Sequence, residues 1–385
     1  YHNMVRTVVL DGIDLARLRR HHHHLAQVIR ALAPNTSAEM LAHIEGAGEG
    51  PDAGPYAAFA AREAMDAGAF ELAASLYGRA GRLSGTHPDR WRWMSARASN
   101  LAAAGRGAVA ARAWLEAVGM LSAVNPLAPE IADMRREAAS ELLRAGRWAA
   151  GIQLMRDVLD ELGVSMPATT PGVVRSLLWH RARLWVRGLH FTPRPPESWD
   201  PTVVRRVDAC WAAAAGLAWV QPARATLFHA RFAREALNLG DPVRGCRALA
   251  SEAAVLSAVG GATPRSTDAM ERCRALLKDI DDPLTHAIVA IAEATLHYFG
   301  GAYPAAQRWV VRAEAILEAD VPGGGWELTS SRAQLVVPGV DGGPARPAPA
   351  PSCAVAGGPG PGRSAGLGDL VVWRADPGLA RRRPP

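Results

Sequence analysis

Lysine is almost absent from this chain, which restricts the phosphate chemistry it could perform. Lys278 is the only lysine in 385 residues. A protein kinase site needs a strand lysine, a glycine-rich loop, an HRD-type loop and a DFG aspartate. None of those motifs occurs, and Lys278 lies in CRALLKDID, where a cation favours the end of a predicted helix. We therefore expect no catalytic role for Lys278.

Two glycine-rich stretches resemble nucleotide motifs only superficially. Gly357–Ser364 reads GGPGPGRS, close to GxxxxGK[ST], but Arg363 replaces the lysine. Pro359 and Pro361 also lack the backbone N–H groups that would cradle a phosphate. The stretch Gly46–Gly50 (GAGEG) is interpreted as a helix terminator before a loop. We predict no nucleotide site and no cofactor.

Histidine and cysteine could in principle bind a metal. His21–His24 are consecutive, however, and consecutive helical positions point around the axis, so we expect a solvated basic helix face. For Cys246 and Cys273 there are two interpretations: the two thiols approach each other across a hairpin, or they are ordinary buried core thiols, which is the interpretation we favour. No CxxC, HExxH, GxSxG or paired-carboxylate motif occurs. The sequence predicts neither a metal site nor a catalytic one.

The stretch Val173–Leu189 combines basic and large apolar residues. It contains Arg175, Arg181, Arg183 and Arg187 among Leu177, Leu178, Trp179, Leu184, Trp185 and Leu189. One interpretation is a helix that meets an acidic partner or a membrane surface. The interpretation we favour is a packed helix whose arginine stems cover apolar surface. By the same argument, Trp91, Trp93, Trp114 and Trp148 are expected in the core.

The elements that would position these residues are helical hairpins. An amphipathic helix, a glycine and a second helix recur, with the turns at Gly68, Gly105, Gly146, Gly240 and Gly301. The first three glycines are 37 and 41 residues apart, which suggests a 34-residue tetratricopeptide period with small insertions. Glycine suits such turns because it adopts left-handed backbone angles without a Cβ penalty. The predicted fold is an all-α, tetratricopeptide-like helical-hairpin solenoid with a disordered C-terminal tail.

Five segments follow from this pattern. They are a helical linker at 1–50, hairpins at 51–162, a basic helix and Pro-rich link at 163–202, further hairpins at 203–337, and a Pro/Gly/Arg-rich tail at 338–385. Asp241-Pro242, Thr263-Pro264 and Asp282-Pro283 predict helix starts within the later hairpins. Gly216 falls inside a predicted helix, so we expect it to tolerate alanine unless another helix packs tightly against it.

Composition points away from nucleic acid and secretion. The net charge is +6, but six arginines against three aspartates beyond Val337 carry half of it. Arginine in place of lysine, with abundant Ala, Gly and Pro, indicates a GC-rich bacterial genome. The N-terminus has no apolar signal region, and the longest apolar run, 209–220, is too short to cross a bilayer. We expect a cytoplasmic chain with no membrane span and no direct nucleic-acid partner. Hydrophobic residues make up 49% of the chain, which is enough for a large core.

Several segments together resemble one family. They are YHNMVRTVVL, LAHIEGAGE, LGVSMPATTPGVVRSLLWHRARLWVRGLHF, RVDACWAAAAGLAWV and GGWELTSSRAQL. As a set they resemble the C-terminal region of large bacterial proteins that join a Ser/Thr protein kinase to an AAA-type ATPase and then to helical repeats. The resemblance covers roughly 1–335. It implies that kinase and ATPase modules lie upstream, and that this chain is a fragment with protein partners or those modules as its contacts.

The tail departs from that family, whose members continue with helical repeats after the WEL segment. An out-of-frame reading of GC-rich DNA would produce its composition, as would a natural disordered tail. With the repeats cut short, we expect an exposed apolar end near Trp309, Val310 and Ile316. The leading functional hypothesis is a non-catalytic scaffold or sensor region. The alternative is the sensor arm of an ATP-dependent transcriptional regulator, and an enzyme in its own right is the weakest.

Overall fold

The computed structural model describes residues 2–32, 37–48, 50–85, 87–321, 323–325 and 327–329. Within these ranges the regular secondary structure is entirely helical, and the prediction of an all-α chain is confirmed. The predicted tail at 338–385, with Arg363 and Cys353, lies outside the described residues.

The helices follow one another through short turns. Their bounds are α1 His2–Asp11, α2 Leu15–Leu32, α3 Ser37–Ala47, α4 Gly50–Asp66, α5 Phe70–Leu83, α6 Arg90–Ala103, α7 Gly107–Val124, α8 Glu130–Arg144, α9 Trp148–Glu161, α10 Thr170–Arg187, the 3-10 turn η1 Pro196–Ser198, α11 Pro201–Leu217, α12 Pro222–Leu239, α13 Pro242–Gly260, α14 Pro264–Leu277, α15 Pro283–Phe299 and α16 Tyr303–Asp320.

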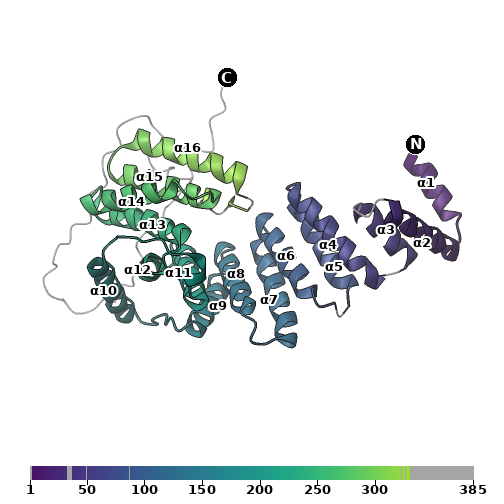
Figure 1. The fold of residues 1–385 in the computed structure, drawn as a ribbon, viewed down its shortest axis with the longest axis horizontal. Helices are drawn as coiled ribbons and strands as arrows, with labels where there is room; N and C mark the ends of the chain where they lie inside the picture. The colour runs from purple at the N-terminus through teal and green to yellow at the C-terminus, as the bar shows by residue number, and fades with distance from the viewer. Residues whose placement is uncertain are drawn as a thin grey trace, which may run out of the picture. The chain divides into compact units, whose positions relative to one another are not determined.

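Consecutive helices lie side by side from α4 to α9 and again from α11 to α16 (Figure 1). The stacking of helices continues from the first series to the second without α10. Helix α11 packs against α8 and α9, as the next member of the stack would, whereas α10 packs along α12. Helix α10 is therefore an insertion between two hairpins rather than a member of either.

The turn glycines end helices by a shared backbone pattern. At Gly146, φ is +72°, its N–H donates to the carbonyl of Leu143, and the next N–H, from Arg147, donates to Leu142. This pair of bonds is a Schellman motif, which satisfies two carbonyls left open at the helix end. Gly68, Gly105 and Gly301 show the same two bonds, and Gly240 has φ +83° at the end of α12.

The predicted starts of the later helices are confirmed. The side chain of Asp241 accepts from the N–H groups of Val243 and Arg244, at 2.9 and 3.2 Å. Thr263 forms a capping box, and the Asp282 carboxylate accepts from the next helix's first turn. In each case a proline follows at the first helical position, where no N–H is needed.

The cores are built mainly from alanine, leucine and methionine, with few rings. One buried cluster runs from α8 to α15, a second joins α6 to α8, and a third joins α2 to α5. Trp114 is buried in the second cluster, and Trp91 packs against it. The prediction fails for Trp148, whose side chain is 52% exposed at the first position of α9.

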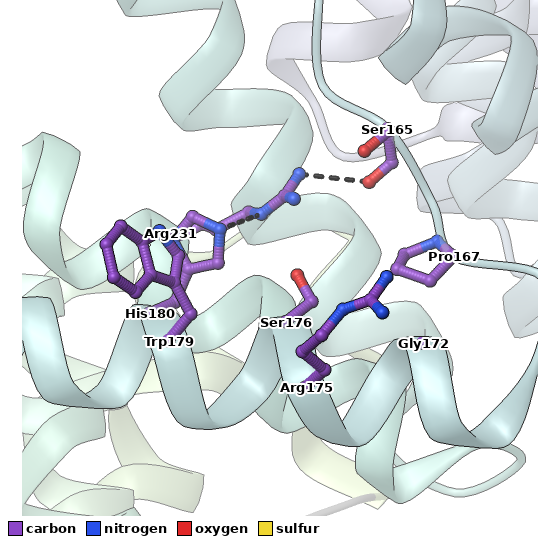
Figure 2. A pocket seen from close by; sticks show the side chains of 8 residues that line it. All are labelled: Ser165, Pro167, Gly172, Arg175, Ser176, Trp179, His180 and Arg231. Carbon is purple, nitrogen blue, oxygen red and sulfur yellow. Dashed lines mark hydrogen bonds between the residues drawn. The ribbon is translucent and has the colours of Figure 1, made fainter.

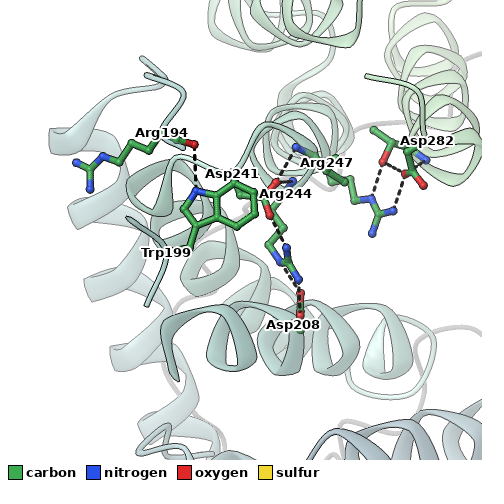
Figure 3. Close-up of polar contacts among 9 residues, drawn as sticks. Arg194, Trp199, Asp208, Asp241, Arg244, Arg247 and Asp282 are labelled. Carbon is green, nitrogen blue, oxygen red and sulfur yellow. Dashed lines mark hydrogen bonds and ion pairs between the residues drawn. The ribbon is translucent and has the colours of Figure 1, made fainter. Parts of the chain in front are cut away.

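Ion pairs connect alternate helices in the second half of the stack. Asp133 on α8 approaches Arg205 on α11, and Asp208 on α11 pairs with Arg244 on α13. Figure 3 shows the second pair and the next one, in which a further arginine of α13, Arg247, reaches the carboxylate that caps α15. These pairs fix the rotation of the joined helices against each other.

Three further expectations are corrected or refined. A Cβ on Gly216 would lie 2.6 Å from Cδ1 of Leu143. Helices α11 and α8 therefore approach each other so closely at this point that an alanine fits only if the Leu143 side chain shifts. Val310 is only 1% exposed and packs inward, so the predicted apolar end is wrong at that position. Among the described helices, α7 alone is long and apolar enough to span a bilayer; it packs along α6 and α8 and buries Trp114.

Candidate functional site

Helix α10 presents a large apolar face that no described residue covers. Val174, Leu178, Trp179, Trp185 and Val186 are all exposed, with Trp185 at 68% and Trp179 at 60%. Only two positions of the helix, Val173 and Leu184, are buried. Because tryptophan normally buries most of its area, two exposed tryptophans on one helix mark an interaction surface. The favoured interpretation of a packed helix is therefore wrong for this face.

The opposite side of α10 is held to α12 and α13 by two of the four predicted arginines. Arg181 pairs with the buried Glu252 at 2.7 Å. Arg187 donates to the side chain of Asn238 and to the carbonyl of Leu237, at 2.7 and 2.8 Å. These contacts fix the rotation of α10 about its own axis, and the apolar face therefore points outward.

The other two arginines, Arg175 and Arg183, are on the exposed side. The Arg183 guanidinium lies 5.7 Å from the ring centre of Trp179, a cation–π distance. For Arg175 we find no hydrogen bond to any residue that the structure describes. The outer surface of α10 thus combines apolar side chains with positive charge.

A hollow of about 630 Å³ lies beside the first half of α10. Figure 2 shows its lining, which consists of Ser165, Pro167, Gly172, Arg175, Ser176, Trp179, His180 and Arg231. Three parts of the chain contribute: the extended segment before α10, the first half of α10 and one arginine of α12. No carboxylate is among these lining residues.

Arg231 forms the floor of the hollow and joins its two sides. Its Nε donates to Nε2 of His180 at 3.0 Å, and one terminal nitrogen donates to the carbonyl of Ser165 at 3.0 Å (Figure 2). Burial and the neighbouring arginines, first of all Arg231, lower the pKa of His180 to about 4. The imidazole is therefore neutral at pH 7 and accepts a hydrogen bond from the guanidinium. Within the described residues Nδ1 of His180 is buried without a hydrogen-bond partner.

The surroundings of this hollow are rich in positive charge. No Asp or Glu occurs between residues 162 and 196, a stretch that contains five arginines. On α12, Arg224 also points here and donates to the carbonyls of Pro167 and Ala168. The arrangement can bind an anion through guanidinium and hydroxyl donors; it offers no nucleophile with an adjacent base.

The predicted turn glycines lie elsewhere. Gly68, Gly105, Gly146, Gly240 and Gly301 all have positive φ at helix ends, and none lines the hollow. Gly163 has φ +72° and the same pair of backbone bonds but was not among the predicted turns. Ser165, His180 and Arg231 were not predicted as site residues either. The one available signal was the absence of acidic residues between 162 and 196.

A second polar group looks like a hydrolase relay but has the wrong proton arrangement. Nε2 of His229 lies 3.1 Å from Oγ of Ser251, and Nδ1 lies 3.8 Å from Glu252. The Ser251 hydroxyl donates to the carbonyl of Arg247, so His229 must donate to it through Nε2. In a catalytic relay the proton sits on Nδ1 and the serine donates. His229 is also fully buried, and we interpret the group as structural.

The remaining candidates show no site within the described residues. No group of three metal-binding side chains occurs there. The rings of His22 and His43 meet, with Nδ1 atoms 3.0 Å apart, so His22 is not part of a solvated face as expected, while His21 and His24 are exposed. Sγ of Cys246 lies 3.5 Å from Sγ of Cys273, and both thiols are buried.

Lys278 is exposed and follows the last turn of α14. Its position at the helix end matches the interpretation drawn from the sequence, and no described pocket contains it.

The chain was compared with protein-family models, curated proteins and solved structures. No family model matches it. No curated protein and no solved structure matches it either.

Proposed function

We propose that this chain is a tetratricopeptide-like helical-repeat scaffold or sensor region that binds a protein partner, and that the outer face of α10 is its docking surface. The observation that carries the proposal is that face. Val174, Leu178, Trp179, Trp185 and Val186 are exposed on a helix that is pinned from behind by Arg181 and Arg187. Rigid aromatic anchors of this kind dominate binding energy at protein interfaces.

The repeat character supports the scaffold. The turns at Gly68, Gly105, Gly146 and Gly301 have one geometry, and neighbouring helices pack on one another. Units that bury one face against the next form extended surfaces suited to helices and peptides. Helix α10 departs from the repeat: it packs along α12 with Leu184 in the core and turns most of its remaining apolar side chains outward, as an element added for binding would.

The resemblance to kinase–ATPase proteins extends the proposal. It makes this chain the regulatory C-terminal part of a cytoplasmic Ser/Thr kinase and AAA-type ATPase signalling protein, with no catalysis of its own. The alternative is the sensor arm of an ATP-dependent transcriptional regulator. Both functions require a surface that binds a signalling protein, and in both we assign that surface to the outer face of α10.

Selection of peptides from a displayed random library tests the docking surface. The purified chain is the bait, and its Leu178→Asp/Trp185→Asp variant is the comparison. Leu127→Asp, at an exposed apolar position between α7 and α8, is the matched control. We expect selected peptides to bind the wild type and the control but not the α10 variant. Peptides that bind all three equally would overturn the proposal.

A further inference from the structure

We infer that the hollow beside α10 is an anion subsite, and that its occupant is an acidic side chain of a peptide segment whose apolar residues lie on the α10 face. The inference rests on the proposed function and specifies the chemistry of the partner. It follows from charge, from hydrogen-bond donors that have no acceptor, and from the continuity of the hollow with the apolar face.

Arg231 forms no ion pair with any carboxylate that the structure describes, and Glu235, one turn further along α12, pairs with Arg234 instead. By contrast, the partly buried Arg244 meets Asp208. Arg231 instead contacts a neutral imidazole and a backbone carbonyl. A partly buried guanidinium without an ion-pair partner carries an uncompensated cost of desolvation. An anion in the hollow would supply that partner.

Several hydrogen-bond donors around the hollow have no acceptor within the described residues. Arg231 uses two of its five N–H groups on His180 and Ser165. Arg175 and Ser176 have no hydrogen bond to any residue in the described ranges, and both line the same hollow. In Figure 2 the Ser176 hydroxyl points between the two guanidinium groups. Two guanidinium groups and a hydroxyl around one recess match the oxygen atoms of a carboxylate or phosphate.

The local electrostatic field also favours an anion. The lining of the hollow includes Gly172 in the first turn of α10, where the helix dipole adds positive potential. The stretch from 162 to 196 contributes no carboxylate, and the nearby Glu235 and Glu252 of the neighbouring helices are paired with Arg234 and Arg181. An acidic segment would thus be attracted to this end of the helix before it makes contact.

The hollow is continuous with the apolar face of α10. Trp179 belongs to both, since it lines the hollow and is 60% exposed on the outer side of α10. A segment with an acidic residue in the hollow would continue past Trp179 onto Leu178 and Trp185. A protein segment suits this better than a bilayer, because the donors converge in a recess bounded by Ser165 and Pro167, where one side chain enters and a flat surface does not.

The test uses the peptides selected on the full chain, measured against three forms of it. Arg175→Gln removes one donor group from an exposed side chain, so folding is preserved, and Arg308→Gln on α16 is the matched control. We expect the selected peptides to be enriched in Asp or Glu next to apolar residues. The Arg175→Gln variant should bind these peptides about tenfold more weakly than the wild type, and Arg308→Gln should bind them with unchanged affinity.

Replacing the acidic residue of the peptide supplies the reciprocal measurement. Changing that residue to Asn or Gln should lower the affinity for the wild-type chain by the same factor, and should not lower the affinity for the Arg175→Gln variant any further. Phosphoserine at that position should retain or improve the affinity. Neutral apolar peptides that still require Leu178 and Trp185 but ignore Arg175 would overturn the anion subsite and leave the docking surface standing. Vesicles of phosphatidylcholine with phosphatidylglycerol form the last arm, and binding of vesicles without any acidic peptide would overturn the inference in favour of a membrane.

Discussion

Arg244 on α13 donates two hydrogen bonds to the carboxylate of Asp208 on α11, Nε to Oδ1 at 2.8 Å and a terminal nitrogen to Oδ2 at 2.7 Å (Figure 3). The same guanidinium also contacts Asp241, the cap of its own helix. A bidentate pair at partly buried positions fixes both distance and angle between two helices. This one joins α11 to α13, two separate helices of the stack, so it should matter more than an ordinary surface pair.

Asp208→Asn should therefore destabilise the chain by about 1–2 kcal/mol, because one charge-assisted pair is lost while Asp241 still neutralises Arg244. The measurement is the free energy of unfolding in urea. The control is Asp268→Asn, whose pair with Arg272 lies within one helix and is nearly half exposed on each side. That variant should change stability by less than about 0.5 kcal/mol. Equal losses in the two variants would refute the special role of the α11–α13 pair.

Gly146 and Gly216 should respond to substitution for different reasons. Gly146 has φ +72° with open space around it, so Gly146→Val should cost about 1–2 kcal/mol through backbone strain alone. Gly216→Ala places a methyl group against Leu143, and should cost about 1 kcal/mol or more.

A double-mutant cycle separates the two causes. In a Leu143→Ala background the added penalty of Gly216→Ala should shrink, because the colliding side chain is gone. The penalty of Gly146→Val should stay the same there. A Gly216→Ala penalty that does not depend on Leu143 would show that the contact between α11 and α8 is misassigned.

The buried His229 predicts acid sensitivity below neutral pH. Burial lowers its pKa to about 4, whereas an unfolded histidine titrates near 6.5. Between those values the unfolded chain binds the extra proton, so stability falls as pH falls from about 6.5 to about 4. The full effect is on the order of 3 kcal/mol. His229→Gln should reduce the slope of unfolding free energy against pH in that window; an unchanged slope would contradict the assignment.

The chain should neither hydrolyse ATP nor transfer phosphate. It lacks the kinase motifs, and its only lysine is an exposed residue at the end of α14. Labelled ATP with a generic protein substrate is the assay. ATP turnover that disappears in Lys278→Ala or Arg363→Ala would contradict the non-catalytic account. ATP turnover that survives both substitutions would indicate a contaminant.

An acidic peptide bound in the hollow should change the titration of His180. Burial and the neighbouring arginines lower its pKa to about 4 in the free chain. A negative group beside Arg231 opposes that effect, so the pKa of His180 should rise on binding. Imidazole NMR signals recorded against pH, with His180→Gln for assignment, provide the measurement. A His180 pKa that stays near 4 with the peptide bound would place the acidic group elsewhere.

The hairpins were predictable because their signals are local. Glycine at Gly146 and the Asp-Pro start at Asp282 act on the backbone within a few residues, and the structure has a helix end and a helix start there. The exposure of Trp148 and Trp185 was not predictable, because it depends on which helices lie opposite. Helical periodicity says that a face is apolar but does not say whether a neighbour covers it.

The hollow had a further obstacle. Arg231 is more than fifty residues from Arg175 in sequence, and only the return of α12 along α10 brings them to one recess. The sequence did contain the absence of carboxylates between 162 and 196 and the four arginines of α10. Which two of those arginines turn inward, toward Glu252 and Leu237, was decided by packing.

The central claim is that partners dock on the outer face of α10, and site-specific photo-crosslinking tests it most directly. A benzophenone amino acid replaces Leu178 in one version of the full chain and Leu127 in another, both positions being exposed and apolar. Each version is irradiated with the same selected peptide, and the adduct is quantified by intact mass. The account predicts an adduct at position 178 and none above background at 127. Equal adducts at both positions, or none at 178 despite measurable binding, would contradict it.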